Sequence, residues 1–419
     1  MKRQLFGRAW AALAASALMV PALAACGGDT AATPTATTIT GTGEPTATTM
    51  TAEATATTAM EATTPTTGSS TGKTLKVGLV TDVGSLNDKS FNESTWEGVL
   101  RAQKELGVEA KNIETKDTKD YAKNIDQFVS QNYDVIVTVG FALQEATNAA
   151  AKANPNIKFI GVDQFQTDVL PNVSGLIFDE DKAGYLAGAL AASLSKSNNI
   201  GAVCGTDDVP PVWKFGEAYK AGAKSIKPDI TVQVTYHSDV DISKSFVDPD
   251  WGKTTALSMI DKGADVVFGA GGLTGNGAIF AAKERNIAAI GVDKDQYLSI
   301  GEEYKGALAS SAMKLLTPGT FDLIKQVQDG SFKGGNFVGE VALAPFHDWE
   351  SKVPADVKTK LQEIDKGLKD GSIKTCVSPA KGVPSPCGGA AETTPGAAMT
   401  PAAGETPSGV MTPVGTAVP

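Results

Sequence analysis

Carboxylates at the ends of apolar runs are the residues of this sequence best placed to bind a ligand. Asp82 follows "LKVGLVT", Asp163 follows "IKFIGV" and Asp293 follows "IAAIGV". The first run leads into "GSLNDKSFNESTWEG", where a single phenylalanine, Phe91, stands among hydrogen-bonding side chains. Carboxylates accept hydrogen bonds from hydroxyl and amine groups, and an aromatic face suits a flat, polar heterocycle. These residue types predict a binding site for a small polar molecule.

Catalytic chemistry is not indicated by the remaining residues. The two histidines, His237 and His347, lie alone in weakly patterned stretches, and no Cys/His cluster has metal-ligand spacing. No Ser-His-Asp, Cys-His or paired-carboxylate pattern suggests hydrolysis. We therefore expect a protein that is not an enzyme and that uses no cofactor or metal.

Short β-branched runs alternate with helical periods and must position these side chains. Buried strands are predicted at 75–80, 134–139, 157–162, 200–205, 230–236, 265–270 and 287–292. Helices are predicted at 90–106, 119–131, 143–153, 180–196, 213–226, 251–262, 274–285, 314–329 and 354–369. The alternation predicts an α/β fold of right-handed βαβ units, with parallel sheets covered by helices on both faces.

The chain also repeats itself. "YDVIVTVGF", a helix and "IKFIGVDQ" recur as "ADVVFGAGG", a helix and "IAAIGVDKDQ". Asp134 and Asp163 are 29 positions apart, and Asp265 and Asp293 are 28 apart. Ligands of open α/β sheets bind beyond the carboxyl ends of the strands. The repeat therefore predicts two similar lobes that face each other across a ligand-binding cleft.

Part of the polar loop before the first helix has a structural explanation. Ser90 and Glu93 fit a capping box, in which Ser is the N-cap and Glu is three positions later. Capping alone does not require Asp82, Asn87 and Phe91 together, which favours a binding role for the loop.

The two ends of the chain differ from its centre in composition. Residues 1–26 have a basic start, an apolar stretch and "LAAC", which resembles a bacterial lipobox and predicts a lipidated Cys26 after signal cleavage. Residues 27–73 and 388–419 are rich in Ala, Thr and Pro, and we expect a disordered stalk and a disordered tail. The folded unit is predicted at 74–387, and the lipid is expected to be the only membrane anchor.

Charge and cysteine content restrict the partners. The formal net charge of −10 argues against nucleic acid as a partner, and we expect a monomer. A disulfide between Cys376 and Cys387 can close a short loop, whereas Cys204 in an apolar strand suits a buried thiol. The sequence leaves the pairing of these three cysteines open.

Several motifs, in order, resemble the basic membrane protein family of lipoproteins, which are similar to a purine nucleoside receptor. The opening motif is "TDVGSLNDKSFNESTWEG", followed by "GLIFDEDKAGYLAGALAA", "FGEAYKAGAK", "GADVVFGAGGLTGNGAIFAAKE", "IGVDKDQY" and "SSAMK". Members of the family are the substrate-binding components of nucleoside ABC transporters. The resemblance implies a two-lobed periplasmic-binding-protein type I fold, with the ligand in the cleft between two lobes of parallel sheet and flanking helices. It also implies a nucleoside of the guanosine, inosine or adenosine class as ligand and an ABC permease as partner, on the extracytoplasmic face of the cell membrane.

The resemblance assigns roles to individual residues. Phe91 would stack on one face of the purine, with Phe268 or Phe215 opposite, and Asp163 and Asp82 would lie near the base. Asp293 and Lys314 would hold the ribose hydroxyls. Backbone amides would approach the ligand at Gly271, Gly272 and Gly275. Asn87 would contact the base edge, although many relatives carry paired aspartates where this chain has Leu86-Asn87-Asp88.

Two other functions remain compatible with the sequence. A binding protein or sensor for a sugar or an autoinducer would use the same scaffold, since the fold does not fix the ligand. An NAD-dependent oxidoreductase is suggested by the glycine-rich turn "GAGGLTGNG" before Asp293. G-x-G-x-x-G fails at Thr274, however, and an extracytoplasmic enzyme would find little NAD.

Overall fold

The computed structural model describes residues 73–388. The expected signal peptide with Cys26, the stalk up to residue 72 and the tail from residue 389 lie outside these residues. Among the helices that the structure describes, none is long and apolar enough to cross a membrane.

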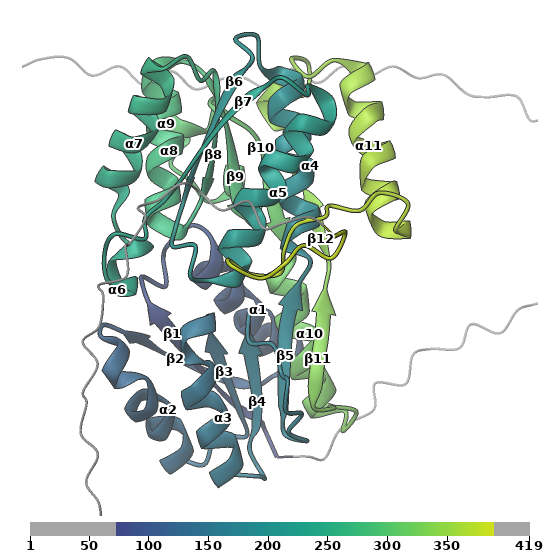
Figure 1. Cartoon of the computed structure of the whole chain (residues 1–419). Coiled ribbons are helices and arrows are strands. Elements are labelled where there is room, and N and C mark those ends of the chain that lie inside the picture. Colours follow the sequence, from purple (N-terminus) through teal and green to yellow (C-terminus); the bar gives the residue numbers. More distant parts are fainter. Residues whose placement is uncertain (1–72, 389–419) are drawn as a thin grey trace, which may run out of the picture. The chain divides into compact units, whose positions relative to one another are not determined.

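The first lobe is built on a six-stranded sheet in which all strands run parallel, in the order β11-β5-β4-β3-β1-β2. The inner strands are buried on both faces because helices cover both sides of the sheet, whereas the edge strands β2 and β11 are partly exposed (Figure 1). Their bounds are β1 Lys76–Val83, β2 Glu109–Thr115, β3 Val135–Val139, β4 Lys158–Val162, β5 Val173–Phe178 and β11 Gly335–Gly339.

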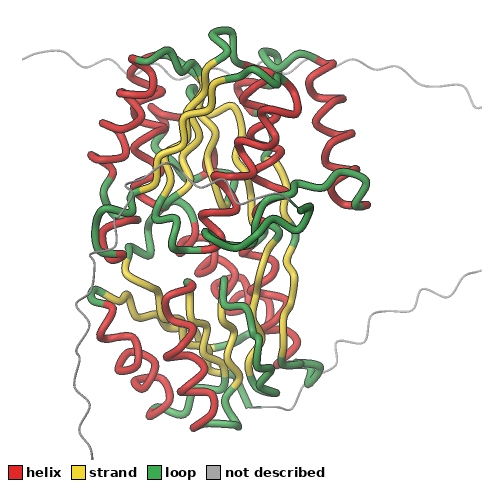
Figure 2. The backbone as a smooth tube through the Cα atoms, viewed as in Figure 1, coloured by secondary structure: helices red, strands yellow, loops and turns green. Residues whose placement is uncertain are grey.

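The second lobe repeats this topology strand for strand. Its order is β12-β10-β9-β8-β6-β7, and only the pairing of β10 with the short edge strand β12 is antiparallel. The two sets of strands are seen in yellow in Figure 2. Their bounds are β6 Asn199–Cys204, β7 Thr231–Tyr236, β8 Val266–Ala270, β9 Ala288–Asp293, β10 Leu308–Lys314 and β12 Val341–Leu343. The internal repeat predicted from the sequence is thus β3–α3–β4 in one lobe and β8–α8–β9 in the other.

Helices follow most strands, as expected for βαβ units. They are α1 Phe91–Leu106, α2 Tyr121–Ser130, α3 Gln144–Ala153, α4 Glu180–Leu194, α5 Pro210–Ile226, α6 Ile242–Ser245, α7 Pro249–Asp261, α8 Gly272–Arg285, α9 Glu302–Lys305, α10 Leu316–Gln328 and α11 Ala355–Asp370. Short 3-10 turns lie at Thr118–Asp120, Phe141–Leu143, Gln296–Leu298 and His347–Trp349.

The chain passes between the lobes three times within the described residues. It crosses after β5 into α4, after β10 into α10, and after β11 into β12. Helix α10 packs in the core of the first lobe, through Leu316 and Phe321, although it follows a strand of the second lobe. Each lobe therefore contains a segment of chain that arrives from the other lobe. The three crossings follow the ends of β5, β10 and β11.

The predicted strands and helices are all present, but one boundary matters for the site. The sequence places Lys314 at the start of a helix, and this is wrong: Lys314 is the last residue of β10. The strand "LASSAMK" is rich in Ala and Ser rather than in β-branched residues, so its pattern is weak. It is buried because it lies between β9 and β12.

The cysteines behave differently from one another. Cys376 and Cys387 form a disulfide that closes a loop after α11. Cys204 is a free thiol in the core of the second lobe, at the end of β6.

Candidate ligand-binding site

A cleft lies where the carboxyl ends of strands from both lobes meet. Its volume, counted out to open solvent, is about 800 Å³. Eight of the residues singled out in the sequence line it: Asp82, Phe91, Asp163, Phe215, Gly271, Gly272, Asp293 and Lys314. They come from the ends of four strands and from three helices, so the fold brings together residues that are up to 232 positions apart.

Lys314 is the electrostatic centre of the cleft. Its Nζ lies 2.6 Å from Asp163 Oδ2 of the first lobe, and 3.8 Å from both Asp293 Oδ1 and Glu180 Oε1. The side chain is only 3% exposed. Burial lowers the pKa of Lys314, but the three surrounding carboxylates raise it more, so that the ammonium is held in its charged form.

The rings of Phe91 and Phe215 both lie near this ammonium. Lys314 Nζ is 4.5 Å from the Phe91 ring centroid and 5.9 Å from that of Phe215. The sequence predicts that Phe91 and Lys314 serve opposite ends of a ligand, whereas the structure places them in contact. Val209, Pro211 and other apolar residues continue the Phe215 wall. The cleft thus combines apolar walls with a charged floor.

Asp163 and Asp293 occupy equivalent positions in the two lobes. Both have left-handed backbones, with φ of 60° and 65°, which is uncommon outside glycine and clusters at functional sites. A buried glutamine follows each aspartate and packs on the glycine of the preceding "IGVD". Gln164 packs on Gly161 in the first lobe, and Gln296 packs on Gly291 in the second. A Cβ at Gly291 would lie 2.4 Å from Gln296 Oε1, so this support requires glycine. The repeat therefore includes the packing of a glutamine on a glycine next to each aspartate.

The carboxylates are held with few hydrogen-bond donors from the protein itself. Asp293 Oδ2 accepts a 2.7 Å hydrogen bond from Ser90 Oγ across the lobes. Asp163 Oδ1 is buried and has no partner among the described residues. Burial raises the pKa of both carboxyls, and Lys314 opposes that rise. An acceptor buried without a donor costs free energy unless a ligand supplies one.

The capping box predicted at Ser90 is wrong. Ser90 is the N-cap of α1, but its side chain makes no capping bond and donates to Asp293 instead. Asp88 takes the capping role: its carboxylate accepts from the backbone amides of Ser90, Asn92 and Glu93 at 2.8, 2.9 and 3.2 Å. Burial raises the pKa of Asp88 to about 7. The Ser90 hydroxyl, which the sequence predicts to cap its own helix, therefore links the two lobes through Asp293.

Three of the sequence-predicted residues lie away from the cleft. Asn87 is exposed, and Lys89 Nζ donates to its side chain. Gly275 lies within α8, where a Cβ would be 3.0 Å from the backbone of Gly269, so its small size allows the helix to pack on β8.

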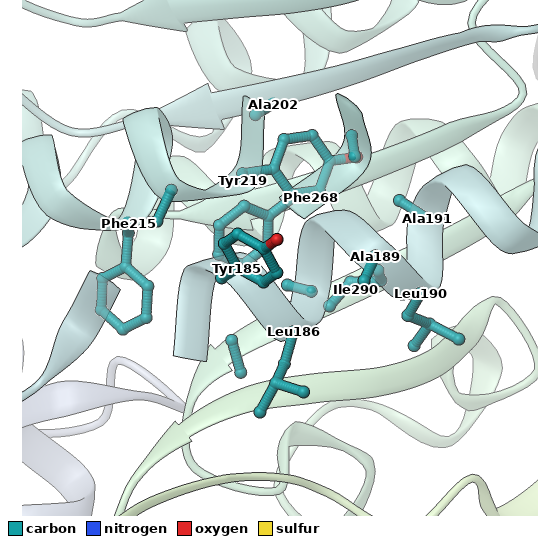
Figure 3. Close-up of a cluster of buried hydrophobic side chains, with 14 of the residues drawn as sticks. Tyr185, Leu186, Ala189, Leu190, Ala191, Ala202, Phe215, Tyr219, Phe268 and Ile290 are labelled. Atoms are coloured by element: carbon teal, nitrogen blue, oxygen red, sulfur yellow. The ribbon is translucent and has the colours of Figure 1, made fainter. Parts of the chain in front are cut away.

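Phe268 is the third of these residues. It is fully buried in β8 and stacks on Tyr219, with a centroid separation of 5.2 Å. Figure 3 shows Phe268 beside Tyr219 within the core, with Phe215 at the edge of the cluster. Of the two aromatics that the sequence left open, Phe215 is the one that lines the cleft.

Glu180 lies beside the cleft, 3.8 Å from Lys314 Nζ, and the sequence analysis missed it. It is 1% exposed at the first position of α4, where the helix dipole favours a carboxylate, and Lys214 pairs with it. The signal was present in the acidic run "DED" at 179–181, which begins a helix that is otherwise apolar. Val209 was also missed because it stands just before a helix start without a distinctive pattern.

Asp82, at the end of β1, is the acidic residue on the opposite side from Lys314. Burial and the negative charges of Asp88 and Asp163 raise the pKa of Asp82 to about 8. At neutral pH the carboxyl is therefore largely protonated, and it can donate as well as accept a hydrogen bond.

Asp82→Asn should remove part of the pH dependence of stability. The pKa of Asp82 is about 8 in the folded protein, whereas its ordinary value is 3.8. Asp82 therefore contributes stability that is fully present below pH 3.8 and is lost as the pH rises to about 8. Asparagine cannot ionise. Urea unfolding should show the variant gaining on the wild type between about pH 4 and about pH 9, whereas Asp168→Asn, at an exposed position, should not. A wild-type-to-variant difference that stays constant with pH would contradict the assignment.

The comparisons with known proteins agree with this geometry. A family model described as ABC transporter substrate-binding protein PnrA-like matches residues 75–339. The chain belongs to this family. It is an ABC transporter substrate-binding protein of the Bmp type, and the family consists of substrate-binding proteins rather than enzymes.

Relatives of this PnrA-like protein include named binding proteins and lipoproteins. The ABC transporter nucleoside-binding protein BmpA of Lactococcus lactis is 36% identical over 282 residues, which are 63% of this chain and 78% of that protein. An uncharacterized lipoprotein of Pyrococcus horikoshii is 33% identical over 270 residues, 63% of this chain and 66% of that one. A solved ABC transporter solute-binding protein from Aeropyrum pernix superposes with a TM-score of 0.63 at 26% identity, covering 72% of this chain and 92% of that chain. The type I periplasmic-binding-protein fold predicted from the sequence is confirmed.

Proposed function

We propose that this PnrA-like protein binds a purine nucleoside, of the guanosine, inosine or adenosine class, and delivers it to the permease of an ABC importer. The observation that carries the proposal is the cleft in which Phe91 and Phe215 flank the cluster formed by Asp163, Asp293 and Lys314. Aromatic faces stack on a purine, while carboxylates accept from ribose hydroxyls and a lysine donates to them. The nucleoside-binding relative from Lactococcus lactis supports this ligand class.

The assignment of the two ends of the ligand follows the same residues. Asp293 and Lys314 would hold the ribose, and Phe91 with Phe215 would enclose the base. Asp82, with its raised pKa, would offer both a donor and an acceptor to the polar edge of the base. The unpaired Asp163 Oδ1 would accept a donor of the ligand. Gly271 and Gly272 line the cleft, where the absence of side chains would allow the ligand to approach their backbone.

We also propose that the chain is attached to the extracytoplasmic face of the membrane through Cys26, with 1–26 as signal peptide, 27–73 as stalk, 74–387 as nucleoside-binding domain and 388–419 as tail. The relative named a lipoprotein supports the anchor. Incorporation of labelled palmitate into the full chain, and its loss in Cys26→Ser, tests the attachment.

The charge of the cleft predicts that nucleotides are rejected. In addition to the largely protonated Asp82, four carboxyl groups lie in or beside the cleft, and among the described residues the ammonium groups of Lys314 and Lys214 oppose them; the four are Asp88, Asp163, Glu180 and Asp293. Both lysines already pair with these acids. A phosphate would therefore meet net negative charge in a partly desolvated site, and like charges juxtaposed in this way cost several kcal/mol.

A competition experiment tests both the ligand class and this rejection. Guanosine or inosine should displace a bound fluorescent nucleoside from the full chain, whereas guanosine 5′-monophosphate should compete at least about 100-fold more weakly. Ribose and other pentoses should not compete. Competition by a pentose or another sugar at concentrations equal to guanosine would instead support a sugar-binding protein on the same scaffold.

A further inference from the structure

The segment that follows α11 lies outside the family match, which ends at residue 339. It runs back from α11 along the second lobe toward α5, and is the yellow chain beyond α11 in Figure 1. Its disulfide joins Cys376 to Cys387, eleven positions apart. We refer to residues 375–387 as the C-terminal brace.

The brace is fastened to the start of α5 by side chains. Trp213 Nε1 donates a 2.9 Å hydrogen bond to Ser378 Oγ. Lys381 Nζ lies 2.9 Å from Asp207 Oδ1, in the loop between β6 and α5, and 3.8 Å from Asp208 Oδ1. Val377 packs against the apolar core of the second lobe. The contacts therefore include a charge pair, a hydrogen bond and an apolar anchor.

The same stretch of chain forms a wall of the cleft. Val209, Pro211 and Val212 line the cleft, and they lie in the sequence between Asp208 and Trp213, which the brace contacts. Phe215, one turn further along α5, carries the second aromatic ring of the site. Residues 206–215 thus have one side toward the ligand site and the other toward the brace.

Other contacts to this stretch come from the second lobe itself. Ser238 Oγ donates to Asp207 Oδ1 at 2.7 Å and accepts from the Asp207 amide at 3.1 Å. The ring of Trp213 stacks on Tyr236 with a centroid separation of 6.0 Å, whereas its indole nitrogen donates to Ser378 of the brace. The disulfide shortens the range over which the brace can move, because closing a loop removes conformational freedom.

We propose that the C-terminal brace holds the α5 wall in the conformation that binds ligand, so that ligand affinity depends on the Cys376–Cys387 disulfide and on Lys381 as a positioning residue. The proposal rests on the proposed nucleoside-binding function for its affinity readout. An extracytoplasmic location favours the oxidised form, since disulfides persist there. Reduction of the Cys376–Cys387 disulfide would leave the aromatic and carboxylate groups of the cleft intact. It would lower the fraction of molecules in which the α5 wall has the conformation that binds ligand.

The test compares matched variants of the purified full chain by calorimetry with guanosine. In Cys376→Ser/Cys387→Ser, we expect only about a fifth to a tenth of the molecules to have the α5 wall in the conformation that binds ligand. Apparent affinity falls in proportion to this fraction, so guanosine should bind about five- to tenfold more weakly. Lys381→Ala should weaken binding about threefold on the same ground, and Lys381→Arg should restore it because it keeps the charge. Lys369→Ala removes an exposed 2.7 Å pair with Asp365 on α11, outside the brace, and should leave affinity unchanged.

Hydrogen exchange of residues 206–213 provides the readout that does not depend on the ligand. Exchange there should be faster in the double cysteine variant and in Lys381→Ala, while the first lobe is unchanged. If the wild-type chain binds no nucleoside, the proposed function fails but this exchange still tests the brace. Wild-type affinity and wild-type exchange in Lys381→Ala would overturn the proposal, even where the cysteine variant does not fold.

Discussion

Lys314→Met is expected to destabilise the protein by about 3–5 kcal/mol at neutral pH, the usual cost of removing one partner from a buried charge cluster. Lys314 is 3% exposed and is the shared partner of Asp163, Glu180 and Asp293. Methionine keeps most of the side-chain volume, so the loss reflects charge rather than a cavity. Ligand binding should be lost with it, because the remaining carboxylates repel one another across the cleft.

The pH dependence distinguishes this electrostatic account from simple loss of packing. Burial raises the pKa of Asp163, Glu180 and Asp293 in the wild type, and without the ammonium they should rise further. A group with a raised folded-state pKa contributes stability at low pH that is lost as the pH rises. The deficit of Lys314→Met, measured as the difference in free energy of unfolding from the wild type, should therefore shrink as the pH falls toward about 4.

The matched control is Lys325→Met on α10. Lys325 is 53% exposed and pairs with Asp329 at 3.0 Å, so its loss should change stability by no more than about 1 kcal/mol. A Lys314→Met deficit that is equally large at every pH, or one as small as that of Lys325→Met, would contradict the central role of the ammonium.

Asp293→Ala is expected to lower nucleoside affinity about tenfold or more and to reduce the preference for ribonucleosides over deoxyribonucleosides. Asp293 is buried, and beyond Ser90 Oγ at 2.7 Å its carboxylate retains acceptor capacity toward the cleft. A deoxynucleoside leaves that acceptor partly unpaired, which is the source of the preference. Asp168→Ala, at an exposed loop position, serves as the control and should bind as the wild type does.

Phe91→Ala should give the opposite pattern. Stacking does not depend on the sugar, so all purine nucleosides should lose affinity by similar factors and the preference for ribose should remain. Phe165, 56% exposed and outside the cleft, provides a control through Phe165→Ala. Calorimetry with guanosine and its 2′- and 3′-deoxy forms measures both effects. Full ribose preference in Asp293→Ala, or its loss in Phe91→Ala alone, would show that the base and sugar ends are assigned incorrectly.

The repeated pattern explains why much of the site could be predicted from the sequence. Asp163 and Asp293 are each the last residue of the same "IGVD", and the carboxyl ends of parallel strands meet at one edge of each sheet. Their convergence therefore follows from the local pattern together with the topology. Lys314 entered through a family resemblance rather than through its surroundings, because a strand of Ala and Ser gives little β signal.

The incorrect or unresolved predictions share a physical cause. In each case a contact with a residue distant in sequence determines where the side chain lies. Ser90 fits a local capping box, yet its hydroxyl bonds to Asp293, 203 positions away. Asp88 then caps α1 from two residues earlier. Phe268 could not be placed from the sequence because a strand covered on both faces gives no alternation of apolar and polar residues, so it could not be separated from Phe215 on α5. The packing of Tyr219 on Phe268 decides between them.

Direct calorimetric titration of the purified full chain with purine nucleosides tests the central claim. The account predicts that guanosine, inosine or adenosine binds at a single site, that ribose gives no heat of binding, and that Lys314→Met abolishes the signal while Lys325→Met retains it. Binding of ribose or another free sugar in preference to every purine nucleoside, or nucleoside binding that survives Lys314→Met at neutral pH, would contradict the account.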